Sequence, residues 1–279
     1  MRTHQALDVS NRAYAMGLAR AFGGALLFAL PLMMTMEMWA LGFYAHPVRL
    51  LLFLLVNFAI LVGLSRFGGF ERTSNLFEDL LDALAACAVA IIVAGLILAL
   101  FGILTAGMPL DELVGKIAVQ SIPCSFGAMI ARKQLSSGES GEDPAQEERT
   151  GRYAAQLFLM LAGALFVAFN VAPTEEMILI GFMMSPVHAI LLVLLSILLL
   201  HAFVFGIGFA GQEGQQDQSG HNCLFLRFSL SGYGIALLDI LYVLWTFGRI
   251  EAPLSDAVRS VIVLGFPAAL GAALARLVV

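Results

Sequence analysis

The stretch "GALLFALPLMMTMEMWALGFYAHPV", residues 24–48, contains one charged residue, Glu37, in an otherwise apolar sequence. The apolar run that starts after Arg20 is about as long as the ~20 residues that a helix needs to cross a bilayer. The whole chain is similar, since 60% of its residues are hydrophobic, 13% are charged and the mean hydropathy is +0.90. Soluble domains carry roughly 25% charged residues. The sequence therefore predicts an all-α, polytopic membrane protein.

The same pattern recurs in the second half of the chain. Residues 24–48 align with "GALFVAFNVAPTEEMILIGFMMSPV", residues 163–187, at an offset of 139. At an offset of 144, "PLDELVGKIAVQSIPCSFGAMIAR" (109–132) aligns with "PLSDAVRSVIVLGFPAALGAALAR" (253–276). Apolar composition produces chance matches of leucine and alanine, but not matched proline, glycine, glutamate and arginine. The alignment predicts a tandem duplication.

Each half is predicted to contain four transmembrane helices. An even number per half gives both copies the same orientation, so we expect eight helices arranged as two parallel four-helix repeats. The predicted helices are 21–43, 47–67, 80–105 and 112–132 in the first half, and 153–176, 187–209, 228–248 and 256–277 in the second. The predicted organisation is an N-terminal segment (1–20), a first repeat (21–132), a polar linker (133–152) and a second repeat (153–279).

Lysine and arginine placement predicts the topology. Eleven of these residues fall on one side of the predicted helices, and only four, Arg49, Lys116, Arg249 and Arg259, fall on the other. The positive-inside rule then places both termini, the linker 133–152 and the polar loop 211–221 in the cytoplasm. The predicted location is the bacterial inner (plasma) membrane.

Two glutamates are the first candidate functional residues. Glu37 and Glu176 align, near the extracytoplasmic ends of their predicted helices, and each follows a threonine by two residues, Thr35 and Thr174. A carboxylate at that depth needs water, a cation or a hydrogen-bond partner. It could be an interfacial acid that only reaches the headgroups, but its presence in both halves favours a functional role. Glu175 makes the second copy more acidic than the first.

Asp239 is the second candidate. It lies near the middle of the predicted helix 228–248, where the first repeat has Gly95. Acids at such a depth face a bundle interior, an aqueous cavity or a polar partner. A structural hydrogen bond to a neighbouring helix explains Asp239 equally well. Asp111, Glu112 and Lys116, by contrast, resemble a solvated helix start outside the membrane.

Several other classes of function find little support. The chain has no basic stripe or aromatic platform typical of nucleic-acid binding. It also lacks the His-Glu-x-x-His, Ser/His and Cys/His patterns of enzymes, so we expect neither an enzyme nor a bound cofactor. Cys87, Cys124 and Cys223 lack metal or redox spacing, and the methionines of 33–38 are typical of packing. The sequence leaves metal binding open.

Two resemblances bear on these residues. The stretch "RAFGGALLFALPLMMTMEMW" (20–39) and the layout around it resemble a bacterial family of integral membrane proteins of unknown function, over most of the chain. That resemblance implies a membrane protein and no particular activity. The shorter "TMEMW" (35–39) resembles the Thr-x-Glu-x-Trp filter of bacterial voltage-gated sodium channels, whose glutamates form a four-membered ring. The second copy has Ile178 where Trp39 stands, and the chain has no arginine-repeat voltage sensor.

These observations lead to three hypotheses of function. The first is a cation-conducting protein in which Glu37, Glu176 and their neighbours attract the ion, and in which a homodimer would bring four glutamates together. The second is a proton-coupled secondary transporter in which Asp239 and the glutamates titrate. The third is a membrane scaffold or sensor without transport. The expected partners are cations or protons and the lipid bilayer.

Overall fold

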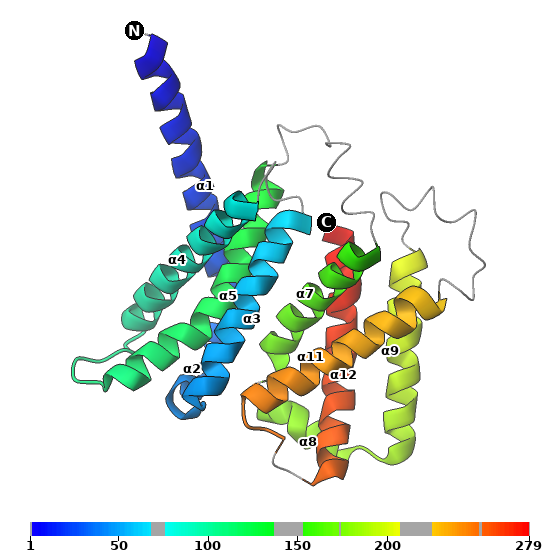
Figure 1. Cartoon of the computed structure of the whole chain (residues 1–279). Helices are drawn as coiled ribbons and strands as arrows, with labels where there is room; N and C mark the ends of the chain where they lie inside the picture. Colours follow the sequence, from blue (N-terminus) through cyan, green and yellow to red (C-terminus); the bar gives the residue numbers. More distant parts are fainter. Residues whose placement is uncertain are drawn as a thin grey trace. The chain divides into compact units, whose positions relative to one another are not determined.

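A computed structural model describes residues 2–67, 76–136, 153–172, 174–206, 225–250 and 253–278. The chain divides into two compact units, Met1–Gly141 (unit 1) and Glu142–Val279 (unit 2). All regular structure within the described ranges is helical (Figure 1). Unit 1 contains α1 (Arg2–Met33), α2 (Met36–Tyr44), α3 (Pro47–Phe67), α4 (Leu76–Leu100) and α5 (Leu110–Ser136). Unit 2 contains α7 (Tyr153–Val171), α8 (Glu175–Met183), α9 (Pro186–Gly206), the π-helix η1 (Phe225–Leu230), α11 (Ser231–Thr246) and α12 (Leu254–Val278).

Eight of these helices are long and apolar enough to cross a membrane, which confirms the predicted fold class and number of spans. The helix α1 begins at Arg2, so the predicted N-terminal segment 1–20 continues into the first span without a break. The division between the units falls within the range 133–152. Most of that predicted linker, and all of the loop 211–221, lie outside the described residues.

The first predicted helix of each half is interrupted, and this corrects the expected ranges 21–43 and 153–176. In unit 1 the long helix α1 ends at Met33 and the nine-residue α2 begins at Met36. In unit 2 α7 ends at Val171 and the nine-residue α8 begins at Glu175. A nine-residue helix is only about 13 Å long, too short to span a bilayer. We call the end of each unit where its short helix lies the outer end, following the predicted topology.

Each short helix is bounded by residues that favour a turn. Thr35 and Thr174 have extended backbone angles at the N-terminal boundaries of α2 and α8. The helices that follow, α3 and α9, begin with Pro47 and Pro186. Proline favours the first position of a helix, because its fixed φ suits the helix and its missing N–H would be unpaired there anyway.

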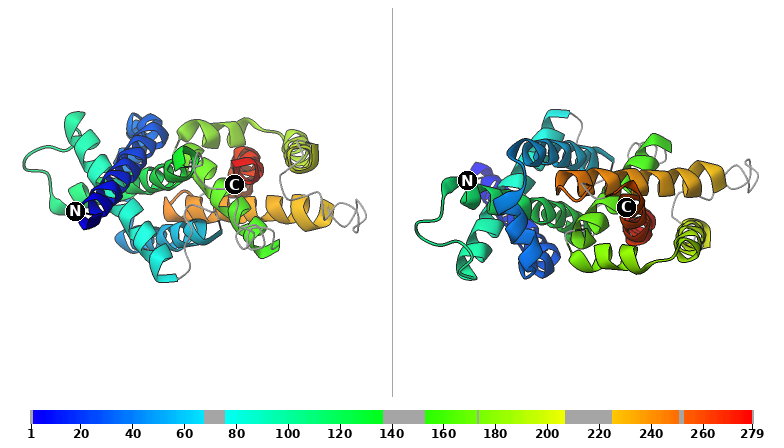
Figure 2. Two further views of the ribbon diagram at one scale, coloured as in Figure 1. Left: turned by 90° about the horizontal axis from the view of Figure 1, so that it is seen from above. Right: turned by 90° about the horizontal axis from the view of Figure 1, so that it is seen from below.

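The last long helix of each unit lies at its centre (Figure 2). In unit 1 α5 contacts α1, α2, α3 and α4. In unit 2 α12 contacts α7, α8, α9 and α11. Each central helix contains the proline that the two halves share, Pro123 or Pro267. The remaining helices of a unit are therefore held together largely through one helix.

Glycines allow the first helix of each unit to approach the central helix closely. A Cβ on Gly24 of α1 would collide with the backbone of Gly127 on α5, and a Cβ on Gly163 of α7 would collide with the backbone of Gly271 on α12. These are aligned pairs in the two halves. Small residues at such points let helix backbones meet, which is how helices commonly associate in membranes.

Candidate functional site

The aligned glutamates occupy the same place in the two short helices. Glu37 is the second residue of α2, and Glu176 is the second residue of α8. The threonine hydroxyls before them turn backwards: Thr35 Oγ1 donates to the Leu32 carbonyl at 2.7 Å, and Thr174 Oγ1 donates to the Val171 carbonyl at 2.8 Å. Neither threonine side chain caps its short helix. The first backbone N–H groups thus keep their partial positive charge, which a nearby carboxylate stabilises.

The surroundings of the two glutamates differ. Glu37 is half-buried and Glu176 is exposed, and neither makes a hydrogen bond or ion pair with another described residue. Glu175 is also exposed, and its carboxylate lies 3.6 Å from the guanidinium of Arg249, which follows α11. Within unit 2 the structure therefore groups Thr174, Glu175 and Glu176 at the outer end of the unit.

A buried lysine lies against α2, the helix that carries the first glutamate, and sequence reasoning missed it. Lys116 was expected in a solvated helix start, but it is only 5% exposed. Its ammonium group pairs with Glu112 one turn earlier on α5 and lies 5.4 Å from the centre of the Trp39 ring on α2. The four-residue spacing of Glu112 and Lys116 predicts an ion pair on one helix face. The burial of Lys116 could not be predicted from the sequence, because Trp39 comes from a distant part of the chain.

Asp239 lies inside unit 2. It is 8% exposed, and its Oδ2 atom has no hydrogen-bond partner among the described residues. It shares a face of α11 with Gly232 and Ala236, which are also buried. A Cβ on Gly232 would collide with Met160, so this face of α11 is turned towards α7. A carboxylate in apolar packing without a full set of partners is costly in its charged form.

Other polar groups line the interior of unit 2 along α9, η1 and α11. His201 Nδ1 lies 2.8 Å from Ser229 Oγ, a hydrogen bond whose donor depends on the histidine tautomer. Tyr233, one turn after Ser229, is also buried. The inward-facing sides of these helices therefore carry a series of groups that can accept or donate a hydrogen bond.

The interior of unit 1 is polar in a different way. The Asn57 amide on α3 donates to Ser125 Oγ on α5 at 3.2 Å. Gln120 on α5 is fully buried, and neither polar atom of its side chain has a partner among the described residues. Unit 2 has Leu264 at the position aligned with Gln120. Sequence reasoning did not select Asn57 or Gln120, because single amides are common in apolar helices.

No three His, Cys, Asp or Glu side chains within the described ranges are grouped closely enough to hold a metal ion.

Asp79, at the start of α4, makes a structural contact with α3. It accepts a hydrogen bond of 3.0 Å from Ser65 and lies 3.9 Å from Arg66, both on α3. It ties the two helices together at the inner end of unit 1.

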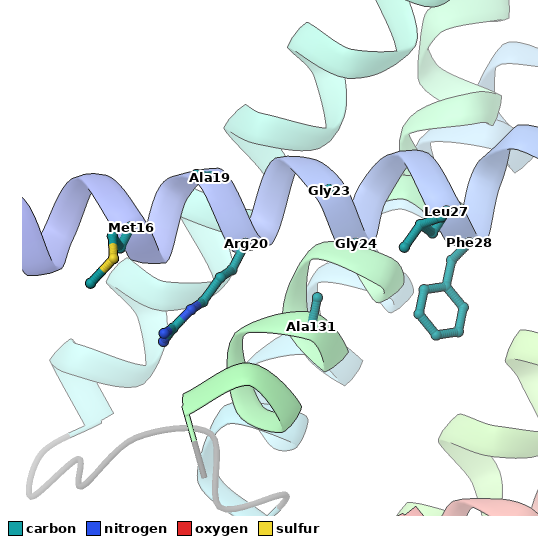
Figure 3. Close-up of a pocket in the computed structure, with 8 residues that line it drawn as sticks. All are labelled: Met16, Ala19, Arg20, Gly23, Gly24, Leu27, Phe28 and Ala131. Carbon is teal, nitrogen blue, oxygen red and sulfur yellow. The ribbon is translucent and has the colours of Figure 1, made fainter. Parts of the chain in front are cut away.

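A groove runs along α1 near the inner end of unit 1 (Figure 3). Its volume is about 500 Å³, and its walls are apolar except for the Arg20 side chain. Ala131 of α5 forms the opposite wall, and every other lining residue belongs to α1. The lining residues are Met16, Ala19, Arg20, Gly23, Gly24, Leu27, Phe28 and Ala131.

Comparison with known proteins agrees with the membrane architecture. A family model described as "Putative integral membrane protein (DUF2391)" matches residues 17–279. No curated protein and no solved structure matches the chain.

Proposed function

The chain belongs to this family of integral membrane proteins, whose description names no activity, and we propose that it carries protons or other small cations across the bacterial inner membrane. The observation that supports this most directly is Asp239, a carboxylate inside the membrane-spanning part of unit 2 with one oxygen unpartnered among the described residues. Acids inside membrane spans commonly mark ion pathways and proton relays.

A proton suits this position better than a larger ion. The face of α11 that bears Asp239 is packed against α7, and its neighbours Gly232, Ala236 and Ile240 are buried. A proton needs no hydration shell and no free volume, and binding it also removes the charge that is costly to bury. We therefore favour proton-coupled transport over an open, water-filled pore through unit 2.

The glutamates support a second candidate, cation conduction. Glu37 and Glu176 occupy the same position at the outer ends of the two units, and Glu175 adds a further acid in unit 2. Carboxylates at a mouth raise the local concentration of cations, and rings of them select cations in channels. In this proposal Thr35 and Thr174 fix the break at which each glutamate is presented, since their hydroxyls close the preceding helix.

The test is proton flux through the purified full chain in liposomes. The vesicles contain a pH-sensitive dye, and a potassium potential set with valinomycin drives protons inward. We expect the wild type to acidify the lumen and Asp239→Asn to lose about tenfold or more of that rate, because an amide cannot release a proton. The Asp239→Asn protein should fold as well as the wild type, since the substitution keeps the shape and removes a buried charge.

Asp256→Asn is the matched control, because Asp256 is an acid in the first turn of α12 of the same unit. We expect it to transport at the wild-type rate. Replacing the potassium potential with a sodium gradient at equal pH distinguishes cation conduction from proton coupling. A folded Asp239→Asn protein with normal proton flux would disprove the role of Asp239. Silence of the wild type under every gradient would leave the scaffold or sensor hypothesis.

A further inference from the structure

The groove on α1 has a geometry suited to a lipid. It is apolar along Gly23 and Leu27 and contains a single cation, Arg20, near the end formed by Met16 (Figure 3). Its volume of about 500 Å³ lies within the range of roughly 300–1,000 Å³ typical of small-molecule sites. Leu27 is 78% exposed, so the groove opens towards the surroundings of unit 1.

Two neighbouring glycines produce this shape. Gly24 is the point of closest approach to α5, where a Cβ would collide with Gly127 and Ala131. Gly23 lies beside it, and a Cβ there would meet nothing within 4 Å. Glycine at position 23 is therefore not required for close helix packing within the described residues, and its lack of a side chain leaves open space along α1.

Arg20 lies at the boundary of the apolar part of α1. Residues 21–33 of this helix carry no charged or polar side chain, so Arg20 is the last charged residue before the apolar run, on the side of the inner end. Figure 3 shows the side chain directed back towards Met16, that is, towards that end. Long arginine side chains reach the interface in this way. Its guanidinium makes no ion pair with another described residue.

We propose that the groove binds one anionic phospholipid. Arg20 pairs with the headgroup phosphate, because a guanidinium donates two parallel hydrogen bonds to phosphate oxygens. One acyl chain lies along Gly23 and Leu27, where the groove is apolar.

The second half of the chain lacks the residues for such a site. At the offset of 139, Leu159 stands in place of Arg20, Ala162 in place of Gly23 and Phe166 in place of Leu27. The cation is thus missing there, and bulkier side chains occupy the path of the acyl chain. The proposal therefore predicts one tightly bound lipid per chain and not two.

Native mass spectrometry of the full chain in detergent tests the site, with phosphatidylglycerol or phosphatidylcholine added. We expect the wild type to retain one phosphatidylglycerol and to bind phosphatidylcholine about tenfold more weakly, because the choline cation offsets the phosphate charge and repels Arg20. Arg20→Gln should lower the affinity for phosphatidylglycerol by a similar factor. Arg20→Lys should restore only part of it, because an ammonium keeps the charge but cannot donate the two parallel hydrogen bonds. Gly23→Leu should displace the lipid by filling the groove, without disturbing the protein, since its Cβ enters open space.

Gly17→Leu is the matched control. Gly17 is on the same helix and also has nothing within 4 Å of an added Cβ, but it does not line the groove. We expect this variant to bind phosphatidylglycerol like the wild type. Equal binding of both lipids by the wild type and by Arg20→Gln would overturn the proposal. A wild-type dimer that Gly23→Leu dissociates would also overturn it, because a second copy of the chain would then occupy the groove.

Discussion

At the scale of single residues, Glu37 and Glu176 have a local reason to be acidic. Each lies in the first turn of a short helix whose N-terminal N–H groups donate no hydrogen bond to the preceding threonine side chain. An acid at that position stabilises a helix by about 0.3–1 kcal/mol. Helix stabilisation is therefore sufficient to explain an acid at this position. A role in attracting ions would be additional, and a flux measurement is needed to detect it.

We expect Glu37→Gln and Glu176→Gln to weaken cation flux or selectivity while lowering the free energy of unfolding by no more than about 1 kcal/mol. The double variant should lose more flux than either single variant, since it removes both of the acids that the proposal places on the cation path. Asp256→Asn provides the comparison, because it removes a first-turn acid from α12. If both single variants lose thermal stability while flux per folded molecule stays normal, the glutamates are only structural.

At the scale of helices, the contact of α1 with α5 depends on which of two adjacent glycines is changed. Gly24→Ala places a methyl group against the backbone of Gly127, so we expect it to destabilise the protein by about 1–3 kcal/mol or more. Gly23→Ala enters open space and removes a flexible residue from a helix, so we expect it to be neutral or stabilising by up to about 1 kcal/mol. Thermal unfolding of the two purified variants measures the difference. Equal melting temperatures would show that α1 does not pack on α5 at Gly24.

The long helices could be predicted from the sequence, but the breaks before α2 and α8 could not. Thr35 and Glu37 are the only polar residues in 21–43, so hydropathy registers one long segment. A threonine is also acceptable within a membrane helix, because its hydroxyl can bond to the preceding turn. The same bond, Thr35 to Leu32, here accompanies the end of the helix.

The candidate site was predictable only in part, for a related reason. Asp239 was identified by the rarity of an acid at that depth, and its burial agrees with an inward-facing position. Lys116 and Gln120 were not identified, because their burial depends on helices that meet α5 from other parts of the chain. Tertiary contacts of this kind leave no pattern along a single helix.

At the scale of the whole molecule, the eight spans make a clear prediction about topology. An even number of crossings would place the two ends of the chain on one side of the membrane, and the eleven-to-four division of lysine and arginine predicts that this side is the cytoplasm. Reporter fusions after Arg72, within 133–152 and at Val279 should all give a cytoplasmic signal. An extracytoplasmic signal from the range 133–152 would contradict the topology.

The position of the central helices has a consequence for how the protein is made. Both α5 and α12 follow the other helices of their units along the chain, so the ribosome delivers each central helix last. Until α5 has been synthesised, Gly24 cannot pack against Gly127, and the earlier helices of unit 1 lack the helix that most of them contact. A premature stop just before α12 would thus remove the centre of unit 2, even though most of its residues had already been translated. Late truncations should harm each unit nearly as much as early ones.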